Sequence, residues 1–307
     1  MRSILTNPLG ARARRDTRAV LAAALTALLA SLALAPAQVA VEDDLGREVR
    51  LVDPAQRVVT MIPTHTETVC ALDACDLLVG RDTFSNHPPS VTELPDLGSA
   101  FSPDLEALVA LEPDLVLTDE YSGMASSLDD VSVPAYAGTA QTLEDVWRTT
   151  RQVGTLLGRD EEAADLITAA QARVAALTAR VEGRPGPSVF VELDATPYSV
   201  GETSYLGRLL TLAGGDNVVP AELGEFPQVD PELVIEADPE VILLADAPHG
   251  ESADTVADRP GWGQLRAVRE GRVIELTQAQ VDLLTRAGPR LPDALALLIE
   301  LLHPDLD

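Results

Sequence analysis

One phrase occurs twice in this sequence, at positions more than a hundred residues apart. Residues 102–119 read SPDLEALVALEPDLVLTD, and residues 230–246 read DPELVIEADPEVILLAD. Each copy begins with a good helix-capping residue and then a proline, whose missing N–H costs nothing in the first turn of a helix. Each copy then passes a second proline and becomes a short apolar run, typical of a parallel strand covered on both faces. The repetition predicts two similar α/β units, with helices that begin at Ser102 and Asp230.

Strand and helix patterns place one such unit in each half of the chain. In the first half we expect a hairpin that turns at 44–46 and strands at 57–62, 77–80, 115–118 and 133–136. A helix should follow the first of these strands, because Thr64 and Glu67 have the spacing of a capping box. In the second half we expect strands at 189–193, 241–244 and 272–275 and helices at 205–212 and 292–302.

Two helices are expected to connect the halves, at 143–157 and 161–182. The second carries apolar residues at three- and four-residue spacing and would span about 33 Å, which is long enough to bridge two lobes. The predicted fold class is α/β, with two similar α/β lobes joined by a single long helix and a ligand cleft between them. The expected domains are an N-terminal lobe at 38–140, connecting helices at 141–185 and a C-terminal lobe at 186–307.

The N-terminus has the pattern of a secretory signal peptide. Residues 1–37 contain a basic flank, an apolar run and a small-residue cleavage site, which predicts cutting before Gln38. An uncleaved membrane anchor is the alternative, although the apolar run is slightly short for a spanning helix. No cysteine lies near the cleavage site, so a lipid anchor is not expected. We therefore expect secretion to the periplasm or cell envelope.

The chain is strongly acidic. It has 49 Asp and Glu against 22 Lys and Arg, and all of the basic residues are arginine. Removal of residues 1–37 would take away five arginines and one aspartate, which changes the formal net charge from −27 to −31. This charge argues against binding to nucleic acid and favours a basic docking partner.

Cys70 and Cys75 are the only cysteines. An exported protein can form disulfides, so a local bridge between them is one reading. The two residues are five apart across a helix end, so such a bridge would be strained, and the interpretation we favour is a pair of small buried thiols. A metal site would need further ligands nearby.

Several stretches resemble one protein family, and they occur in the family's order. They are DDLGREV, RVVTMIPTHTETVCAL, LLVGRDTFSNHPPSV, LPDLGSAFSPDLEALVALEPDLVL and LLTLAGGDNVV. Together they resemble the helical-backbone class of periplasmic binding proteins, which deliver cobalamin, ferric siderophores or haem to ABC importers. The resemblance implies a solute-binding protein that captures a metal chelate and passes it to a membrane permease. The resemblance favours cobalamin or another corrinoid over a ferric siderophore or haem. The two-lobe pattern around a single connector predicts a monomer that binds one chelate. The sequence has no Gly-rich phosphate loop, no Gly-x-Ser-x-Gly elbow and no Cys/His arrangement of catalytic type, so we expect neither an enzyme nor a cofactor.

The resemblance also implies where the ligand binds. The positions in the first half are Thr64, His65, His87, Ala100, Phe101, Asp119 and Tyr121. Those in the second half are Tyr198, Phe226, Asp282 and Arg286. Aromatic and imidazole rings would offer flat area to a macrocycle, while the charged residues would pair with polar groups at its rim. Several positions that carry tryptophan in cobalamin binders carry Ala, Asp or Phe here, which leaves the identity of the chelate open.

His87 has two readings. It could ligate the metal of a haem or corrinoid through a neutral imidazole, or it could only stack or form hydrogen bonds at the cleft rim. The other histidines are scattered and do not form the compact cluster that a bare metal ion needs. We therefore expect no other metal ligand.

The two copies of the phrase each contain a glutamate near the helix start. In the family that the chain resembles, one exposed glutamate on each lobe docks on arginines of the permease, which implies Glu106 and Glu232 here. The alternative is that both glutamates only stabilise their own helices, through the attraction of a negative charge to the positive N-terminal end of the helix dipole. Aligning the phrases matches Glu232 with Asp104 rather than with Glu106, so Asp104 is the other candidate.

Overall fold

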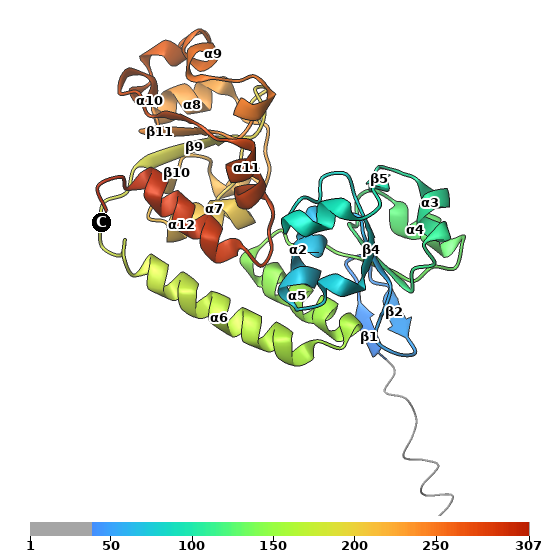
Figure 1. The fold of residues 1–307 in the computed structure, drawn as a ribbon. Coiled ribbons are helices and arrows are strands. Elements are labelled where there is room, and N and C mark those ends of the chain that lie inside the picture. The colour runs from blue at the N-terminus through green and yellow to red at the C-terminus, as the bar shows by residue number, and fades with distance from the viewer. Residues whose placement is uncertain (1–38, 307) are drawn as a thin grey trace, which may run out of the picture.

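The computed structural model describes residues 39–306, so the predicted signal peptide and its cleavage site lie outside the described residues. Two sheets of four strands form two lobes (Figure 1). Within residues 39–306, no helix is both long and apolar enough to cross a membrane.

The N-terminal lobe is built on a parallel sheet with the strand order β4-β3-β7-β8. Its strands are β3 (Val58–Thr60), β4 (Leu78–Arg81), β7 (Leu115–Thr118) and β8 (Ala135–Ala137). Its helices are α2 (Pro63–Ala71), α3 (Leu105–Ala110) and α4 (Met124–Asp129), with 3-10 turns at Cys75–Leu77 and Pro89–Glu93. Two antiparallel pairs flank it, β1 (Val39–Glu42) with β2 (Glu48–Leu51) and β5 (Gly98–Ser99) with β6 (Ser102–Pro103).

The C-terminal lobe repeats this plan with the strand order β10-β9-β11-β12, again parallel. Its strands are β9 (Ser188–Glu192), β10 (Asp216–Asn217), β11 (Val241–Leu244) and β12 (Val273–Glu275). Its helices are α7 (Tyr205–Leu212), α8 (Pro231–Ala237), α9 (Ala253–Ala257), α10 (Arg266–Arg269), α11 (Gln278–Thr285) and α12 (Leu291–Leu302). The fold is therefore α/β with two similar lobes, as predicted.

Two helices join the sheets. Helix α5 (Leu143–Leu157) has the predicted bounds and begins at a capping box in which Thr142 and Asp145 satisfy each other's backbone N–H groups. Helix α6 (Asp160–Thr178) ends four residues before the predicted end. Figure 1 shows α6 running beneath both lobes, so a single long helix spans the junction.

Alternate residues of each central strand explain why the apolar runs are continuous. In β7, Leu115 and Leu117 pack with residues of α5, whereas Val116 packs on the other face with residues of α4. In β11, Leu243 faces the core beneath α7 and α12, and Ile242 faces a second core around Trp262. Both faces of each sheet are covered, which is the condition under which strands lose polar alternation.

The second copy of the repeated phrase folds as predicted, and the first does not. Asp230 caps α8 and accepts a hydrogen bond from the Glu232 N–H at 2.9 Å. Ser102 and Pro103 instead pair with Gly98 and Ser99 as strand β6. The cap of α3 is Asp104, which accepts from the Ala107 N–H at 2.9 Å, so the predicted helix start at Ser102 is wrong.

Two further predictions in the N-terminal lobe are wrong. Helix α2 begins at Pro63 after Ile62 without any side-chain cap, so Thr64 and Glu67 do not form a capping box. Glu67 instead forms ion pairs with two arginines of the other lobe. Cys70 and Cys75 form a disulfide, because the short turn after α2 brings their Cα atoms to 4.2 Å; neither is a free thiol.

Candidate ligand-binding cleft

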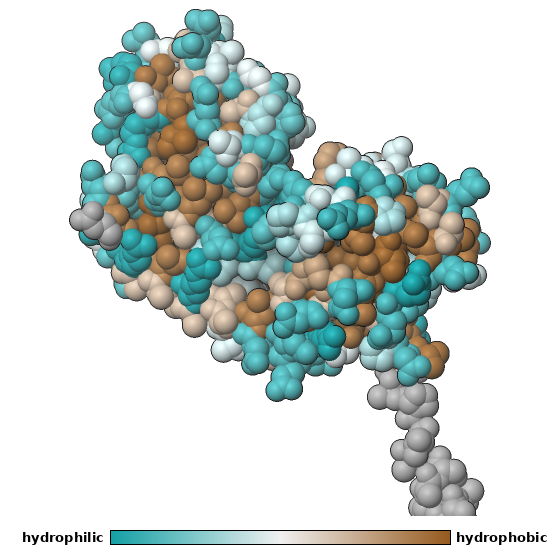
Figure 2. Space-filling view, in the orientation of Figure 1, coloured by the Kyte–Doolittle hydropathy of each residue, from teal (hydrophilic) through white to brown (hydrophobic). Residues whose placement is uncertain are grey.

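A cavity of about 550 Å³ lies between the lobes. It is lined by Thr64, Tyr121, Thr139, Ala140, Gln141, Phe226, Thr285 and Ala287. These residues come from both lobes and from the connection that precedes α5. Figure 2 shows the molecule hollowed between its two lobes. The volume is within the usual range for small-molecule sites.

The parallel sheet of the N-terminal lobe supplies one wall. Tyr121 follows the end of β7, and residues 139–141 follow the end of the neighbouring strand β8. The carboxyl ends of parallel strands lie at one edge of a sheet, which is where open α/β folds bind ligands. Asp119 shapes this edge, since its buried carboxylate accepts hydrogen bonds from the N–H groups of Tyr121 at 2.7 Å and Ser122 at 2.6 Å.

The C-terminal lobe supplies the opposite wall. Phe226 lies on the loop before α8, while Thr285 is the last residue of α11 and Ala287 follows that helix. Tyr121 and Phe226 remain 64% and 48% exposed although both residues line the cavity. Exposed aromatic rings on two facing walls can hold a flat apolar surface between them.

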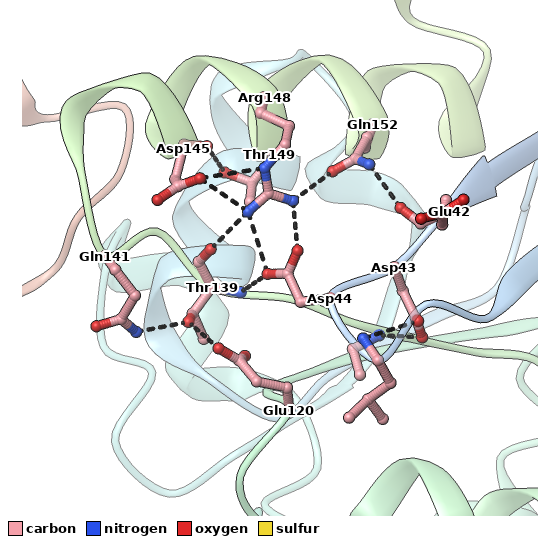
Figure 3. Close-up of polar contacts among 12 residues, drawn as sticks. Glu42, Asp43, Asp44, Glu120, Thr139, Gln141, Asp145, Arg148, Thr149 and Gln152 are labelled. Carbon is pink, nitrogen blue, oxygen red and sulfur yellow. Dashed lines mark hydrogen bonds and ion pairs between the residues drawn. The ribbon is translucent and has the colours of Figure 1, made fainter.

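None of the residues that line the cavity carries a charge. Polar groups are nevertheless ordered along one wall, where Gln141 donates to the Thr139 hydroxyl at 2.9 Å and that hydroxyl donates to Glu120 at 2.9 Å (Figure 3). The wall therefore offers amide and hydroxyl groups for hydrogen bonds with a neutral ligand.

Beside the cavity, a cluster of ion pairs and hydrogen bonds joins the lobes. We call it the interlobe clamp, and it consists of Glu67, Asn86, Asp282, Arg286 and Arg290. Glu67 on α2 is almost completely buried and receives Arg286 at 2.8 Å and Arg290 at 2.7 Å. Arg286 also donates to the Asn86 side chain at 2.8 Å, and Asn86 donates to Asp282 at 2.9 Å. All of these charges are paired within the protein.

The clamp changes the roles expected for Arg286 and Asp282. Arg286 is 9% exposed, and its guanidinium is occupied by Glu67, by Asp282 at 2.9 Å and by the Phe84 carbonyl at 3.1 Å. Neither residue lines the cavity. In this structure they hold the lobes together and offer no free charge to the rim of a ligand.

His65 is also placed differently from the expectation. It is 1% exposed, its Nε2 atom lies 3.2 Å from the Thr118 carbonyl oxygen, and its ring packs edge-on against Tyr136. Burial lowers the pKa of His65 to about 4, against the weaker opposing effect of backbone hydrogen bonds. His65 is thus a neutral core residue without a surface that a ligand could touch.

His87 is half-buried. Its pKa is lowered, first by burial and then by the positive charge of Arg290, which favours the neutral imidazole. A neutral imidazole is the form that can ligate a metal, and His87 as an axial ligand stays a prediction. Within residues 39–306, no group of three or more His, Cys, Asp or Glu side chains could hold a metal ion.

The remaining expected residues lie outside the cavity lining. Ala100 is buried, whereas Phe101 is 75% exposed. Tyr198 is 44% exposed, and its backbone pairs with Asp194 and with Gln228. Gln228 is two residues after Phe226 in the sequence. Of the expected set, the structure brings Thr64, Tyr121 and Phe226 together around one cavity.

Five residues that line the cavity were not predicted from the sequence: Thr139, Ala140, Gln141, Thr285 and Ala287. Residues 139–141 follow the strand expected at 133–136, so the rule that ligands bind at carboxyl ends of parallel strands could have identified them. Thr285 and Ala287 gave no such signal.

Residues 58–279 match the family described as periplasmic binding protein. The chain belongs to the periplasmic binding protein family. It is 26% identical over 279 residues to the uncharacterized ABC transporter substrate-binding lipoprotein YvrC of Bacillus subtilis, covering 87% of this chain and 86% of that protein. It is 28% identical over 241 residues to the vitamin B12-binding protein of Salmonella typhimurium, covering 77% of this chain and 86% of the relative.

Solved structures agree with this assignment. The periplasmic haem-binding protein RhuT from Roseiflexus sp. RS-1, in its apo form, superposes with a TM-score of 0.71 at 26% identity, covering 82% of this chain and all of RhuT. The chain is therefore a solute-binding protein of an ABC transporter. It belongs to the helical-backbone class, also called class III, and has the two-lobed fold of that class.

Proposed function

We propose that this periplasmic binding protein captures one metal chelate between its lobes, cobalamin or another corrinoid in preference to others. The observation that carries the proposal is the cavity of about 550 Å³, with uncharged lining and with Tyr121 and Phe226 on its facing walls. Flat rings and neutral hydrogen-bonding groups suit a corrin, whose periphery is rich in amides. The similarity to vitamin B12-binding proteins supports the same choice.

Ferric siderophores and haem are the alternative ligands. RhuT, which is similar in fold, is named as a haem-binding protein. All three ligand classes are coloured and differ in spectrum, so incubation of the purified protein with each, followed by gel filtration, distinguishes them. We expect corrinoid absorbance to elute with a monomeric protein at one ligand per chain. If none of the three co-elutes, the proposed function is wrong.

We further propose that the loaded protein docks on the permease of an ABC importer outside the cytoplasm, after removal of the signal peptide. Counted from the caps Asp104 and Asp230, both Glu106 and Glu232 are the second residue of their helices. Both are exposed, one on each lobe. Two carboxylates at equivalent positions suit a partner that presents a basic group to each lobe. This register favours Glu106 over Asp104, whose side chain is occupied as a cap.

A further inference from the structure

Two glutamates, one on each lobe, adjoin aromatic residues that line the uncharged cavity. Glu120 precedes Tyr121 on one wall, and Glu225 precedes Phe226 on the other. The pKa of Tyr121 is raised to about 12, first by partial burial of its hydroxyl, then by the adjacent Glu120, and also by the more distant charge of Glu225. The same phenol therefore senses negative charge from each lobe.

The Glu120 carboxylate has capacity to bind more. Its Oε1 atom accepts from the Thr139 hydroxyl at 2.9 Å. In the part of the chain that the structure describes, its buried Oε2 atom has no hydrogen-bond partner, and the same is true of Oδ2 of Asp119, which is 5% exposed. Carboxylate oxygens left without donors are stabilised by an incoming hydrogen-bond donor or cation and destabilised by an incoming anion.

Three arginines near the cavity are already paired with carboxylates. Arg286 and Arg290 are paired with Glu67 in the interlobe clamp. Arg148 lies behind Thr139 and is held by Asp44 at 2.6 Å and by Asp145 at 3.1 Å (Figure 3). The chain contains no lysine that could reach into the cleft.

We infer that the cleft selects chelates by charge: it accepts neutral or positively charged ones and rejects those whose periphery carries free carboxylates, with Glu120 and Glu225 as the discriminating residues. This inference rests on the proposed function, because it assumes that the chelate binds in this cavity. Rejection follows because an anionic group would approach carboxylates, while Arg148, Arg286 and Arg290 are already paired with other side chains. The net charge of −27 acts in the same direction at long range.

The test compares each chelate with a derivative that carries one additional carboxylate. Cyanocobalamin is compared with its monocarboxylic acid, in which one side-chain amide has been hydrolysed. A ferric trihydroxamate with a free terminal amine is compared with its N-succinyl derivative. For each pair that binds, we expect the anionic member to bind at least tenfold more weakly than its parent chelate at low ionic strength. The difference should shrink as salt is added.

The double variant Glu120→Gln with Glu225→Gln should reduce this charge preference at least threefold. The matched control is Glu161→Gln with Glu182→Gln, which removes two exposed carboxylates from the connector and should leave the preference unchanged. Equal or tighter binding of the acid derivatives, tighter binding of haem than of the neutral chelates, or an unchanged preference in the double variant would overturn the inference. Absence of binding for every chelate would instead overturn the proposed function.

Discussion

The carboxylate of Glu67 lies 2.8 Å from the guanidinium of Arg286, although 219 residues separate them in the sequence. Arg290 binds the same carboxylate from the start of α12. Gly288 lies between these two arginines in the sequence. A Cβ atom added to it would be only 3.1 Å from the Thr64 side chain of the other lobe. The lobes therefore meet closely beside the cavity, and a buried charge network fixes this contact.

Glu67→Ala should lower the free energy of unfolding by about 3 kcal/mol, because it leaves Arg290 without its carboxylate partner and Arg286 with the carboxylate of Asp282 alone. Chemical denaturation measures this change. As a control, Glu270→Ala removes an exposed partner of Arg266 and should cost less than about 1 kcal/mol. Equal effects of the two substitutions would show that the clamp adds nothing beyond an ordinary surface pair.

Docking through Glu106 and Glu232 predicts a separation of binding from transport. The double reversal Glu106→Arg with Glu232→Arg should leave chelate affinity unchanged and abolish uptake of labelled ligand by cells, because like charges would then face each other on the permease. Reversal of Glu161 and Glu182 is the matched control for surface charge. If cells with the double reversal take up ligand normally at normal protein levels, these glutamates only stabilise the N-terminal ends of their helices.

The sequence predicted most of the sheet framework, since the evidence for it was local. The runs 115–118 and 241–244 became β7 and β11 with the expected bounds because both faces of each strand are buried. The start of α3 was wrong because Ser102 and Asp104 are both good caps, and only the pairing of β6 with β5 decides between them.

The site was harder to predict because its decisive contacts are non-local. Glu67 has a capping spacing with Thr64, and nothing nearby in sequence indicates that two arginines from the other lobe will bind it. Arg286 has the chemistry of a ligand contact, and only its occupied partners show another role. The aromatic positions Tyr121 and Phe226 were implied by the family resemblance, and the structure places both on the cavity wall.

His65 should make stability depend on pH. Its pKa is about 4 in the folded protein and 6.5 when exposed, so the unfolded state binds the proton more tightly. Its contribution is therefore complete above pH 6.5 and is lost as the pH falls towards 4, by about 3 kcal/mol in total. Unfolding curves of the parent and His65→Gln should converge over this range, whereas the exposed His249→Gln should follow the parent.

Asp246 should have the opposite dependence. It is 5% exposed at the end of β11, and neither of its carboxylate oxygens has a hydrogen-bond partner among residues 39–306. Burial, together with the nearby charge of Glu192, raises its pKa to about 7. Its stabilising contribution is complete below its usual pKa and is lost as the pH rises through 7. Asp246→Asn should therefore stabilise the protein more at pH 8 than at pH 4, and a pH-independent effect would contradict this explanation.

Calorimetric titration of the purified protein with cyanocobalamin tests the central claim most directly. We predict one site per chain, and we predict that Tyr121→Ala and Phe226→Ala each weaken binding by about 2 kcal/mol, because each removes ring area from the cavity wall. Val52→Ala, which truncates an exposed apolar side chain on another surface, should bind like the parent. Two equal sites, or unchanged affinity in both aromatic variants, would contradict the claim that one chelate is held between the lobes.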